Sequence, residues 1–457
     1  MLKLSVWINL ILCPVGSPPA FASTELKCKV GGFMRYPTAL QNERVKTIMM
    51  IQWLLAWALL AQLGQSPHVD ATALKQIAHK ALKKVERMRN QSLSAPLKMG
   101  VKSRDQVLQF VTQRLADEYG PQKVRAEGWL LKDQGLIPET LDYGAFVTKL
   151  LTEQIAGFYD HTRQELHIAD WLPAAVQEPV MAHEIFHAIQ DQEWGGGKLL
   201  DSKKFGHDQI LAHAALLEGD ATIVMLNYSG GTDMSQSSFG INMVAASLPM
   251  QMSSGQYPTM ASAPDYLKQS LIFPYQQGLL FVAALRQAKL SWDEIRAVYR
   301  DPPSSTEQIL HPKKYYAKKD HPSVVKVPHD LLRGFKAEWF GATGEFHARQ
   351  LLLQRLETVD AIEGASGWDG DYTVVLTKGD ARVTLTHSVW DSASEAREFA
   401  SALKKTFKPS GQTKAPKTLS PVMELRDRTL VYAFSKDETL ARSAIAKSIE
   451  KTSVEMR

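Results

Sequence analysis

One short motif in the chain has residue types and a spacing that suit metal chemistry. Residues 183–187 read His-Glu-Ile-Phe-His, an H-E-x-x-H motif within a largely apolar run. On a helix, His183 and His187 lie one turn apart on the same face, so both imidazoles can bind one metal ion. Glu184 lies about 100° further round the helix, where it can accept a proton from a metal-bound water. The pattern predicts metal-assisted hydrolysis of an amide.

Signals for a helix surround this motif. Pro179 suits a first helical turn, and the three glycines at 195–197 suit the end of a helix. The structural alternative is an amphipathic core helix whose two histidines are hydrogen-bonded to neighbours. We favour the metal site, because a buried face with two histidines and a glutamate is costly unless something pairs them.

A zinc site needs a third protein ligand, which must come from another segment. Residues 207–226 have helical periodicity, and Glu218 stands there among apolar residues, with small neighbours that would let another helix approach. We predict Glu218 as the third ligand, and Asp220 as an acceptor for a histidine ring N–H. His213 and Asp220 are the rival third ligands. A carboxylate on the helix surface is the structural alternative for Glu218.

These stretches together resemble a known family. His183-Glu-Ile-Phe-His-Ala-Ile-Gln-Asp-Gln192, followed by Leu217-Glu-Gly-Asp-Ala221, resembles a mostly uncharacterised bacterial group of zincin-like metallopeptidases of the Glu-ligand (gluzincin) type. Residues 153–168 are similar to the strand pair before the metal helix of that group. Residues 273–281 and 302–312 are similar to its later helix and proline-rich turn. The resemblance implies a zincin-like fold but names no substrate.

The reaction that we expect is hydrolysis of peptide bonds with one Zn²⁺ per chain. Zinc held by His183, His187 and Glu218 keeps one position open for a water molecule. Glu184 accepts the proton of that zinc-bound water and passes it to the leaving amine. The substrate would be a protein or peptide, and the enzyme a zinc metallopeptidase.

The oxyanion that forms during such hydrolysis needs a hydrogen-bond donor besides the metal. The downstream candidates are Tyr275, His311, Tyr315 and Tyr316. We favour Tyr275 and His311 as further catalytic residues, because they lie in the two downstream stretches that resemble the family. The structural alternative is that a tyrosine or histidine beside a proline only packs.

Functions of other classes also fit these residues. One is a non-proteolytic zinc-binding envelope assembly factor or chaperone that uses the same fold as a scaffold. Glu184 argues against it, because a scaffold needs metal ligands but no general base. Another is a zinc hydrolase of non-protein amides, such as cell-wall peptide.

Composition restricts the class of protein. The 457 residues, 44% of them hydrophobic, allow two or three domains with ample core. Both cysteines, Cys13 and Cys28, lie near the N-terminus, so the rest of the chain contains no disulfide. The formal net charge is +5, of which residues 1–65 carry +4 because they contain six Lys/Arg and two Asp/Glu. About +1 is left for the remainder, so no basic patch for nucleic acid is expected.

We interpret residues 1–65 as a leader, signal or anchor segment, with translation starting at an internal methionine. The apolar stretch 48–61 has 14 residues and follows two basic ones, which fits a signal-peptide core better than a span of about 20 residues. The first apolar stretch, residues 4–12, is an alternative leader. Residues 48–61 as a membrane anchor are a further alternative. We expect a secreted or periplasmic protein, membrane-anchored if that segment is not cleaved.

The remaining patterns predict an α+β protein whose catalytic domain, residues 66–360, is mainly helical and zincin-like with a small sheet. Residues 72–89 and 103–118 have the apolar stripes of packing helices. Residues 229–271 contain five methionines and almost no charge. We interpret this Met-rich segment as a packed insertion of loops and a short helix, with an apolar lid over the metal as the alternative.

A small α+β domain is predicted over residues 365–457, after a glycine-containing boundary at 364–370. Strands are expected at 372–377, 382–390 and 429–434, and helices at 394–406 and 438–451. Asp369-Gly-Asp371 is expected to form a turn rather than a calcium site. No catalytic constellation is evident in this region.

Overall fold

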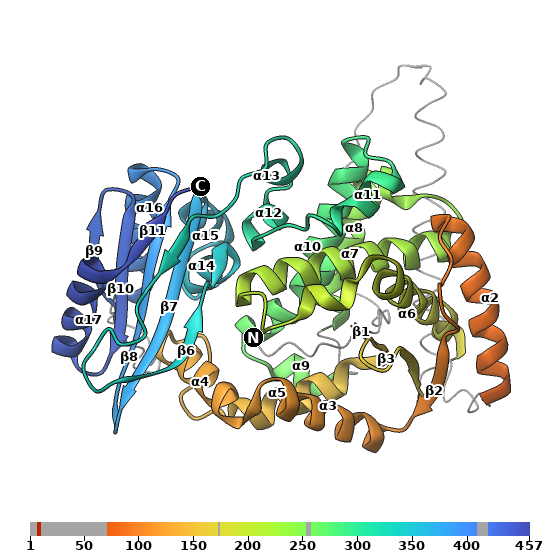
Figure 1. Cartoon of the computed structure of the whole chain (residues 1–457), viewed down its shortest axis with the longest axis horizontal. Helices are drawn as coiled ribbons and strands as arrows, with labels where there is room; N and C mark the ends of the chain where they lie inside the picture. The colour runs from red at the N-terminus through yellow and green to blue at the C-terminus, as the bar shows by residue number, and fades with distance from the viewer. Residues whose placement is uncertain (1–6, 11–70, 172–173, 253–256, 409–418) are drawn as a thin grey trace, which may run out of the picture.

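The computed structural model describes residues 7–10, 71–171, 174–252, 257–408 and 419–457. Helices dominate the region up to residue 316, and a five-stranded sheet with flanking helices forms the opposite end of the molecule (Figure 1). The predicted α+β class is confirmed. Most of residues 1–65, including the stretch 48–61, lies outside the described residues.

A four-stranded sheet precedes the H-E-x-x-H helix. Its order is β1-β3-β4-β2, with β1 (Trp7–Leu10), β2 (Lys98–Lys102), β3 (Ile155–Asp160) and β4 (Glu165–Ala169). Strands β3 and β4 form an antiparallel hairpin, which is the strand pair expected for residues 153–168. Every residue of β3 is buried, since the hairpin lies under the helices.

Three helices lie against this sheet, namely α2 (Ala71–Arg89), α3 (Arg104–Glu118) and α5 (Tyr143–Gln154), and α4 (Gly120–Asp133) packs against α3 and α5. The predictions of helices at 72–89 and 103–118 are confirmed. The start of α3 is set by Ser103, whose side chain accepts from the backbone of Gln106 while the Gln106 side chain accepts from the backbone of Ser103.

Helices α6 (Ala174–Trp194), α7 (His207–Gly230) and α10 (Asp265–Gln287) form the centre of the molecule (Figure 1). Helix α6 ends where Gly195 adopts a φ of +70°, as the glycines predicted. The prediction that Pro179 occupies the first turn was wrong, because α6 begins at Ala174 and continues through the proline. A short 3-10 helix η1 (Gly196–Leu200) joins α6 to α7.

Helix α7 is the one helix in the described part of the chain that is long and apolar enough to cross a membrane. However, 83% of its most apolar window is buried inside the protein, as in the core helix of a globular protein. The apolar character of α7 therefore reflects its central position.

The Met-rich segment forms more helix than expected. It contains η2 (Met234–Gln236), α8 (Ser238–Met252) and α9 (Pro258–Ser262), which lead into α10. The inner face of α8 buries Ile241, Val244, Ala245 and Leu248, with the spacing of a helix. Met252 and Met260 are also buried, whereas Met250 is 73% exposed. These contacts support the packed insertion, although its prediction as mainly loops was wrong.

Three short helices follow, namely α11 (Trp292–Val298), α12 (Thr306–Leu310) and α13 (Lys313–Tyr316). The proline-rich turn expected at 302–312 therefore contains α12. A small two-stranded sheet pairs β5 (Val324–Lys326) with β11 (Ser453–Glu455) near the C-terminus.

The C-terminal sheet is antiparallel with the order β6-β7-β8-β10-β9. Its strands are β6 (Lys336–Gly341), β7 (Trp368–Lys378), β8 (Ala381–Trp390), β9 (Val422–Arg426) and β10 (Thr429–Ser435). The flanking helices are α14 (Gly344–Leu352), α15 (Thr358–Ala365), α16 (Ala393–Phe407) and α17 (Glu438–Lys451). The predicted β-β-α-β-α run is present, and the pattern missed the edge strands β6 and β9.

Side chains alternate between the two faces of this sheet. On β10, Leu430, Tyr432 and Phe434 join the main core, whereas Val431 and Ala433 join a second core with α17. The main core extends without a break into the helical region. The expected boundary at 364–370 therefore lies within one packed unit, since β6 precedes it and Gly370 belongs to β7.

The expected turn at Asp369-Gly-Asp371 was wrong, because all three residues lie in β7. Both carboxylates are buried and hold neighbouring loops. Asp369 accepts hydrogen bonds from the backbone and hydroxyl of Ser323, and Asp371 accepts one from the backbone of Thr343.

Candidate metal centre

Three predicted ligands come together at the centre of the molecule. The Nε2 atoms of His183 and His187 on α6 are 2.9 Å apart, and Glu218 Oε2 on α7 lies 3.1 Å and 3.4 Å from them. Four-coordinate zinc with bonds of about 2.0–2.1 Å places its ligand atoms about 3.3 Å apart. The three sides of the observed triangle are close to that spacing, so the residues fit the ion geometrically.

The protonation of the cluster also suits a cation. Burial, followed by the neighbouring His187, lowers the pKa of His183 to about 4, so this imidazole is neutral at pH 7. Burial alone would raise the pKa of Glu218, but His187 and His183 outweigh it and lower that pKa below its ordinary value. The cluster therefore offers a neutral imidazole on His183 and an ionised carboxylate on Glu218, which are the forms that bind metals.

The tautomer of His187 is fixed by Gln190, one turn further along α6. His187 Nδ1 lies 2.6 Å from Gln190 Oε1, while Gln190 Nε2 donates to the backbone carbonyl of Leu217 at 3.0 Å. Because a carbonyl oxygen only accepts, the amide must point its NH₂ group there and its oxygen towards His187. His187 therefore carries its proton on Nδ1 and has its lone pair on Nε2, the atom in the triangle.

Glu184 is completely buried beside this cluster. Among the described residues no side chain hydrogen-bonds to its carboxylate, and the backbone of Tyr159 is its polar neighbour. Burial, and then the nearby charge of Glu218, raise the pKa of Glu184 well above its ordinary value. An acid that is desolvated without a counter-ion is costly for folding, so Glu184 is a candidate for a role in chemistry.

Tyr275 on α10 reaches the same cluster. Its ring stacks on His183 with centroids 6.4 Å apart, and its hydroxyl group hydrogen-bonds to Glu218. Burial, followed by the charges of Glu218 and Glu184, raises the pKa of Tyr275 well above its ordinary value. The phenol therefore stays protonated and is a hydrogen-bond donor beside the metal ligands.

Two glycines allow α10 to approach α7 this closely. A Cβ on Gly219 would lie 2.1 Å from the backbone of Gly278, and one on Gly278 would lie 2.0 Å from the carbonyl of Ala215. Gly219 follows Glu218 directly, and Gly278 lies about one turn after Tyr275. The small residues beside Glu218 thus permit the helix approach that the sequence suggested, and the crossing sets Tyr275 against Glu218.

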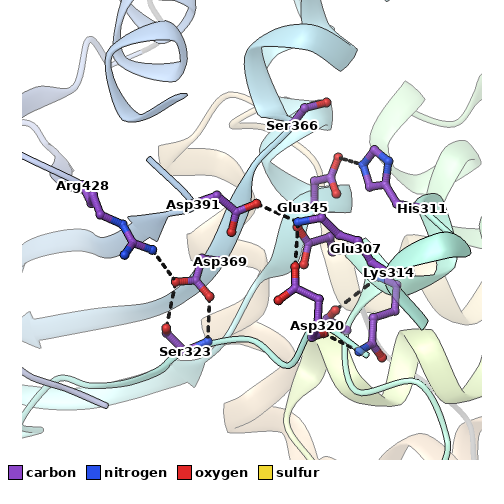
Figure 2. A network of polar contacts seen from close by, with 12 residues as sticks. Glu307, His311, Lys314, Asp320, Ser323, Glu345, Ser366, Asp369, Asp391 and Arg428 are labelled. Carbon is purple, nitrogen blue, oxygen red and sulfur yellow. Dashed lines mark hydrogen bonds and ion pairs between the residues drawn. The ribbon is translucent and has the colours of Figure 1, made fainter. Parts of the chain in front are cut away.

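The structure does not bring His311 to the cluster. His311 Nε2 lies 3.0 Å from Glu345 Oε1 (Figure 2). It also lies 3.1 Å from the guanidinium of Arg349, and both partners are on α14. A cation and an anion of the C-terminal region thus flank this ring, and its predicted role as an oxyanion donor has no geometric support. Tyr315 donates to the carbonyl of Asp301, also away from the metal ligands.

The rival third ligands have other partners. His213 Nδ1 lies 2.7 Å from the carbonyl of Leu199, and its ring packs edge-on against Phe205. Asp220 forms an ion pair with Arg89. The expectation that Asp220 accepts directly from a histidine was wrong, because Gln190 takes that place.

A second cluster of potential ligands lies where α12 and α13 approach the end of β8 in the C-terminal sheet. Carboxylate oxygens of Glu307, Asp320 and Asp391 approach one another within 4.8 Å. Lys314 Nζ lies among them, at 2.6 Å from Glu307, 2.9 Å from Asp320 and 2.7 Å from Asp391 (Figure 2). The lysine ammonium, with three donors, already fills the place of a cation there.

The sequence analysis missed Gln190 and its outer partner Tyr299. Gln190 was detectable in principle, because a polar residue three positions after His187 lies on the same helix face. Tyr299 was not, because more than one hundred residues separate it from the motif.

Comparisons with known proteins concern a different part of the chain. The model of a domain of unknown function, DUF8575, matches residues 339–449, which run from β6 into α17. The metal-ligand cluster lies outside the matched residues. Neither the search of curated proteins nor that of solved structures gave a match. The chain is therefore similar to DUF8575 over its C-terminal sheet and helices.

Proposed function

We propose that this protein is a zinc-dependent endopeptidase with a zincin-like fold of the gluzincin type. The observation that carries the proposal is the triangle of His183, His187 and Glu218, with Glu184 buried beside it and no side chain among the described residues hydrogen-bonded to its carboxylate. The hairpin of β3 and β4 before α6, and the second ligand helix α7, support the fold assignment.

Zinc at this position would supply a Lewis acid for a peptide carbonyl and lower the pKa of a water molecule. Side chains of the protein supply the remaining chemistry. Glu184 holds the proton between the attack and the departure of the amine, for which its raised pKa is suited. Tyr275 donates a hydrogen bond to negative charge that develops near Glu218.

The proposed substrate is a protein or peptide outside the cytoplasm. The support for secretion is the apolar stretch 48–61, which has the length of a signal-peptide core. If that segment is not cleaved, the enzyme is membrane-anchored. Edman sequencing of protein recovered from the cell envelope checks this: a mature terminus near Ser23 would contradict translation from an internal methionine.

The burial of the cluster favours one other candidate, a zinc-binding assembly factor or chaperone without peptidase activity. His183 and His187 are 0% exposed and Glu218 is 7% exposed, as in a structural metal site. A peptidase with this geometry must open to admit its substrate. Glu184 favours the peptidase, because a structural site has no use for an unpaired buried carboxylate.

Zinc content and peptide turnover of the purified full chain separate these functions. For the peptidase we expect about one zinc per chain, by analogy with other zincins, and cleavage of unfolded casein. Glu184→Gln should keep the zinc and lose about 10²- to 10⁴-fold in kcat. The matched control is Glu193→Gln on the same helix, where Glu193 accepts from Gln91, and it should keep both properties.

Two outcomes would overturn the proposal. Zinc retained in a wild-type protein that cleaves neither casein nor a mixed peptide library would favour the scaffold. A well-folded protein without affinity for zinc would contradict both candidates.

A further inference from the structure

A chain of hydrogen bonds runs from His187 to helix α2, at the edge of the molecule. Gln190 Nε2 donates its second hydrogen to the hydroxyl of Tyr299, at 2.7 Å. Tyr299 in turn donates to Asp220 Oδ2 at 2.9 Å. Asp220 is completely buried on α7. The hydrogen bonds that link Gln190 to Asp220 through Tyr299 therefore both run in the direction of the Asp220 carboxylate.

Arg89 completes this chain from α2. Its guanidinium makes two hydrogen bonds to the Asp220 carboxylate, at 2.5 Å and 3.1 Å, and the arginine is only 5% exposed. The rings of Phe186 and Trp292 lie 4.5 Å and 4.2 Å from the guanidinium carbon. A bidentate pair with aromatic faces around it is the environment in which a buried arginine keeps its charge.

The direction of these bonds has a consequence for the metal ligand. Both Asp220 oxygens accept hydrogen bonds from Arg89, so Tyr299 donates to Asp220 and can offer Gln190 only a lone pair. The Gln190 amide is then held by two acceptors, Leu217 and Tyr299, and its oxygen stays on His187 Nδ1. A hydrogen-bond acceptor on the far nitrogen of a histidine makes the near nitrogen a better metal ligand.

The other histidine has no such support. His183 Nδ1 is buried and has no hydrogen-bond partner among the described residues. Of the two histidines, therefore, only His187 has its tautomer fixed by a hydrogen bond from the described residues. An outer network that ends in a buried ion pair is also more than packing requires, because burying such a pair stabilises a fold little or not at all.

We propose that Tyr299 and Arg89 are positioning residues of the metal centre, which hold His187 in its Nδ1–H tautomer and so set the affinity for zinc. Helix α2 is then part of the centre, although it contributes no ligand. The proposal about affinity rests on the proposed zinc site, whereas the proposal about the tautomer does not require a metal.

The test uses Tyr299→Phe, which removes one hydroxyl group from the full chain. Zinc affinity is measured by competition with a chromophoric chelator, and the His187 tautomer of the metal-free protein by ¹⁵N NMR of labelled histidine. We expect about 10- to 100-fold weaker zinc binding, the range for outer partners of a ligand histidine. We also expect a mixture of His187 tautomers in place of the Nδ1–H form alone.

Tyr266→Phe is the matched control, because Tyr266 is equally buried and its hydroxyl hydrogen-bonds a different histidine, His347. It should leave zinc affinity and the His187 tautomer unchanged. Arg89→Lys keeps the charge but loses the bidentate geometry, so its affinity should lie between those of the wild type and Arg89→Met. If the methionine variant is poorly folded, Arg89→Lys still tests the proposal, because it should bind zinc more weakly than the wild type.

Two results separate this inference from the proposed function. If the wild type binds zinc and cleaves peptide but Tyr299→Phe binds zinc within twofold and keeps the Nδ1–H tautomer, the positioning role is wrong and the peptidase stands. If the wild type binds no zinc, the proposed function fails, and the tautomer of the metal-free variant still decides whether Tyr299 positions His187.

Discussion

Two groups of three side chains in the described part of the chain bring potential metal-ligand atoms within 4.8 Å of one another, and they differ in what lies between those atoms. In the first group the ion pairs of Glu218, among the described residues, are with His183 and His187. In the second group, Lys314 lies between Glu307, Asp320 and Asp391 (Figure 2). In the second group the Lys314 ammonium takes the place of a cation, and we propose that zinc takes this place in the first group.

The comparison shows that proximity of ligands does not by itself identify a metal site. Nitrogen ligands with a fixed tautomer and a single carboxylate suit zinc, whereas three carboxylates around an ammonium suit an internal ion pair. The second group joins the helical region to the C-terminal sheet through ion pairs of Lys314 with Glu307 and Asp391. This structural role is sufficient to explain why the three carboxylates lie together. The two groups are distinguished by the types of their ligand atoms and by the lysine in one of them, rather than by the number of carboxylates.

Removing a ligand should have the largest effect and tests the comparison directly. Glu218→Ala should weaken zinc binding by more than the roughly 100-fold upper limit seen for outer partners of a ligand. Asp391→Ala should leave zinc affinity unchanged, because Lys314 holds that position. Competition titrations measure the zinc affinity of both full-length variants. If both lost the same affinity, the distinction between the two groups would be wrong.

The helix crossing that sets Tyr275 against Glu218 should be nearly as sensitive. Gly278→Ala would force a methyl group to 2.0 Å from the Ala215 carbonyl, so we expect a loss of roughly 3 kcal/mol in the free energy of unfolding. Gly230→Ala, near the end of α7, meets its nearest atoms at 3.7 Å and should be neutral or slightly stabilising. Urea titrations measure both, and a neutral Gly278→Ala would contradict the close crossing.

Removal of the internal cation tests the second group. Lys314→Met should leave three carboxylates without their counter-ion, at a cost of about 1–3 kcal/mol, reduced from the value for a fully buried pair because Lys314 is partly exposed. Lys319→Met is the control, since Lys319 pairs with the exposed Asp301 and should contribute less than about 1 kcal/mol. Denaturant midpoints compare the two, and a cost no larger than that of the control would show that Lys314 does not complete the cluster.

A buried histidine that is complete without a metal should show its effect as a dependence of stability on pH. His347 bonds to Gln134 and Tyr266, and burial lowers its pKa from 6.5 to about 3. The unfolded chain therefore binds the proton first, and the stability that His347 contributes above pH 6.5 is lost as the pH falls towards 3. The loss is about 1.4 kcal/mol per pH unit at most.

Unfolding titrations between pH 7 and 4 measure this slope. In His347→Gln the slope should be shallower, whereas replacement of the exposed His79 by Gln should leave the slope of the wild type. An unchanged slope in His347→Gln would mean that this histidine does not stay neutral in the folded protein.

The sequence by itself predicted the local part of this centre. His183, Glu184 and His187 lie on one helix, so helical geometry alone fixes their relation. Glu218 followed from a carboxylate in an apolar helix between small residues, and the α+β class from periodicity. The structure confirms the α+β class and brings these four side chains together. Each was identified from the pattern of its own helix, which depends on residues within a few turns of one another.

Only the tertiary structure decided which distant side chains join the centre. Tyr275 and His311 had equal support in the sequence, yet the crossing of α7 and α10 brings Tyr275 to Glu218, whereas His311 pairs with Glu345. Gln190, Tyr299 and Arg89 are connected by hydrogen bonds that span up to 131 positions. No local pattern encodes such contacts, because they depend on how helices pack and on which buried polar groups must find partners.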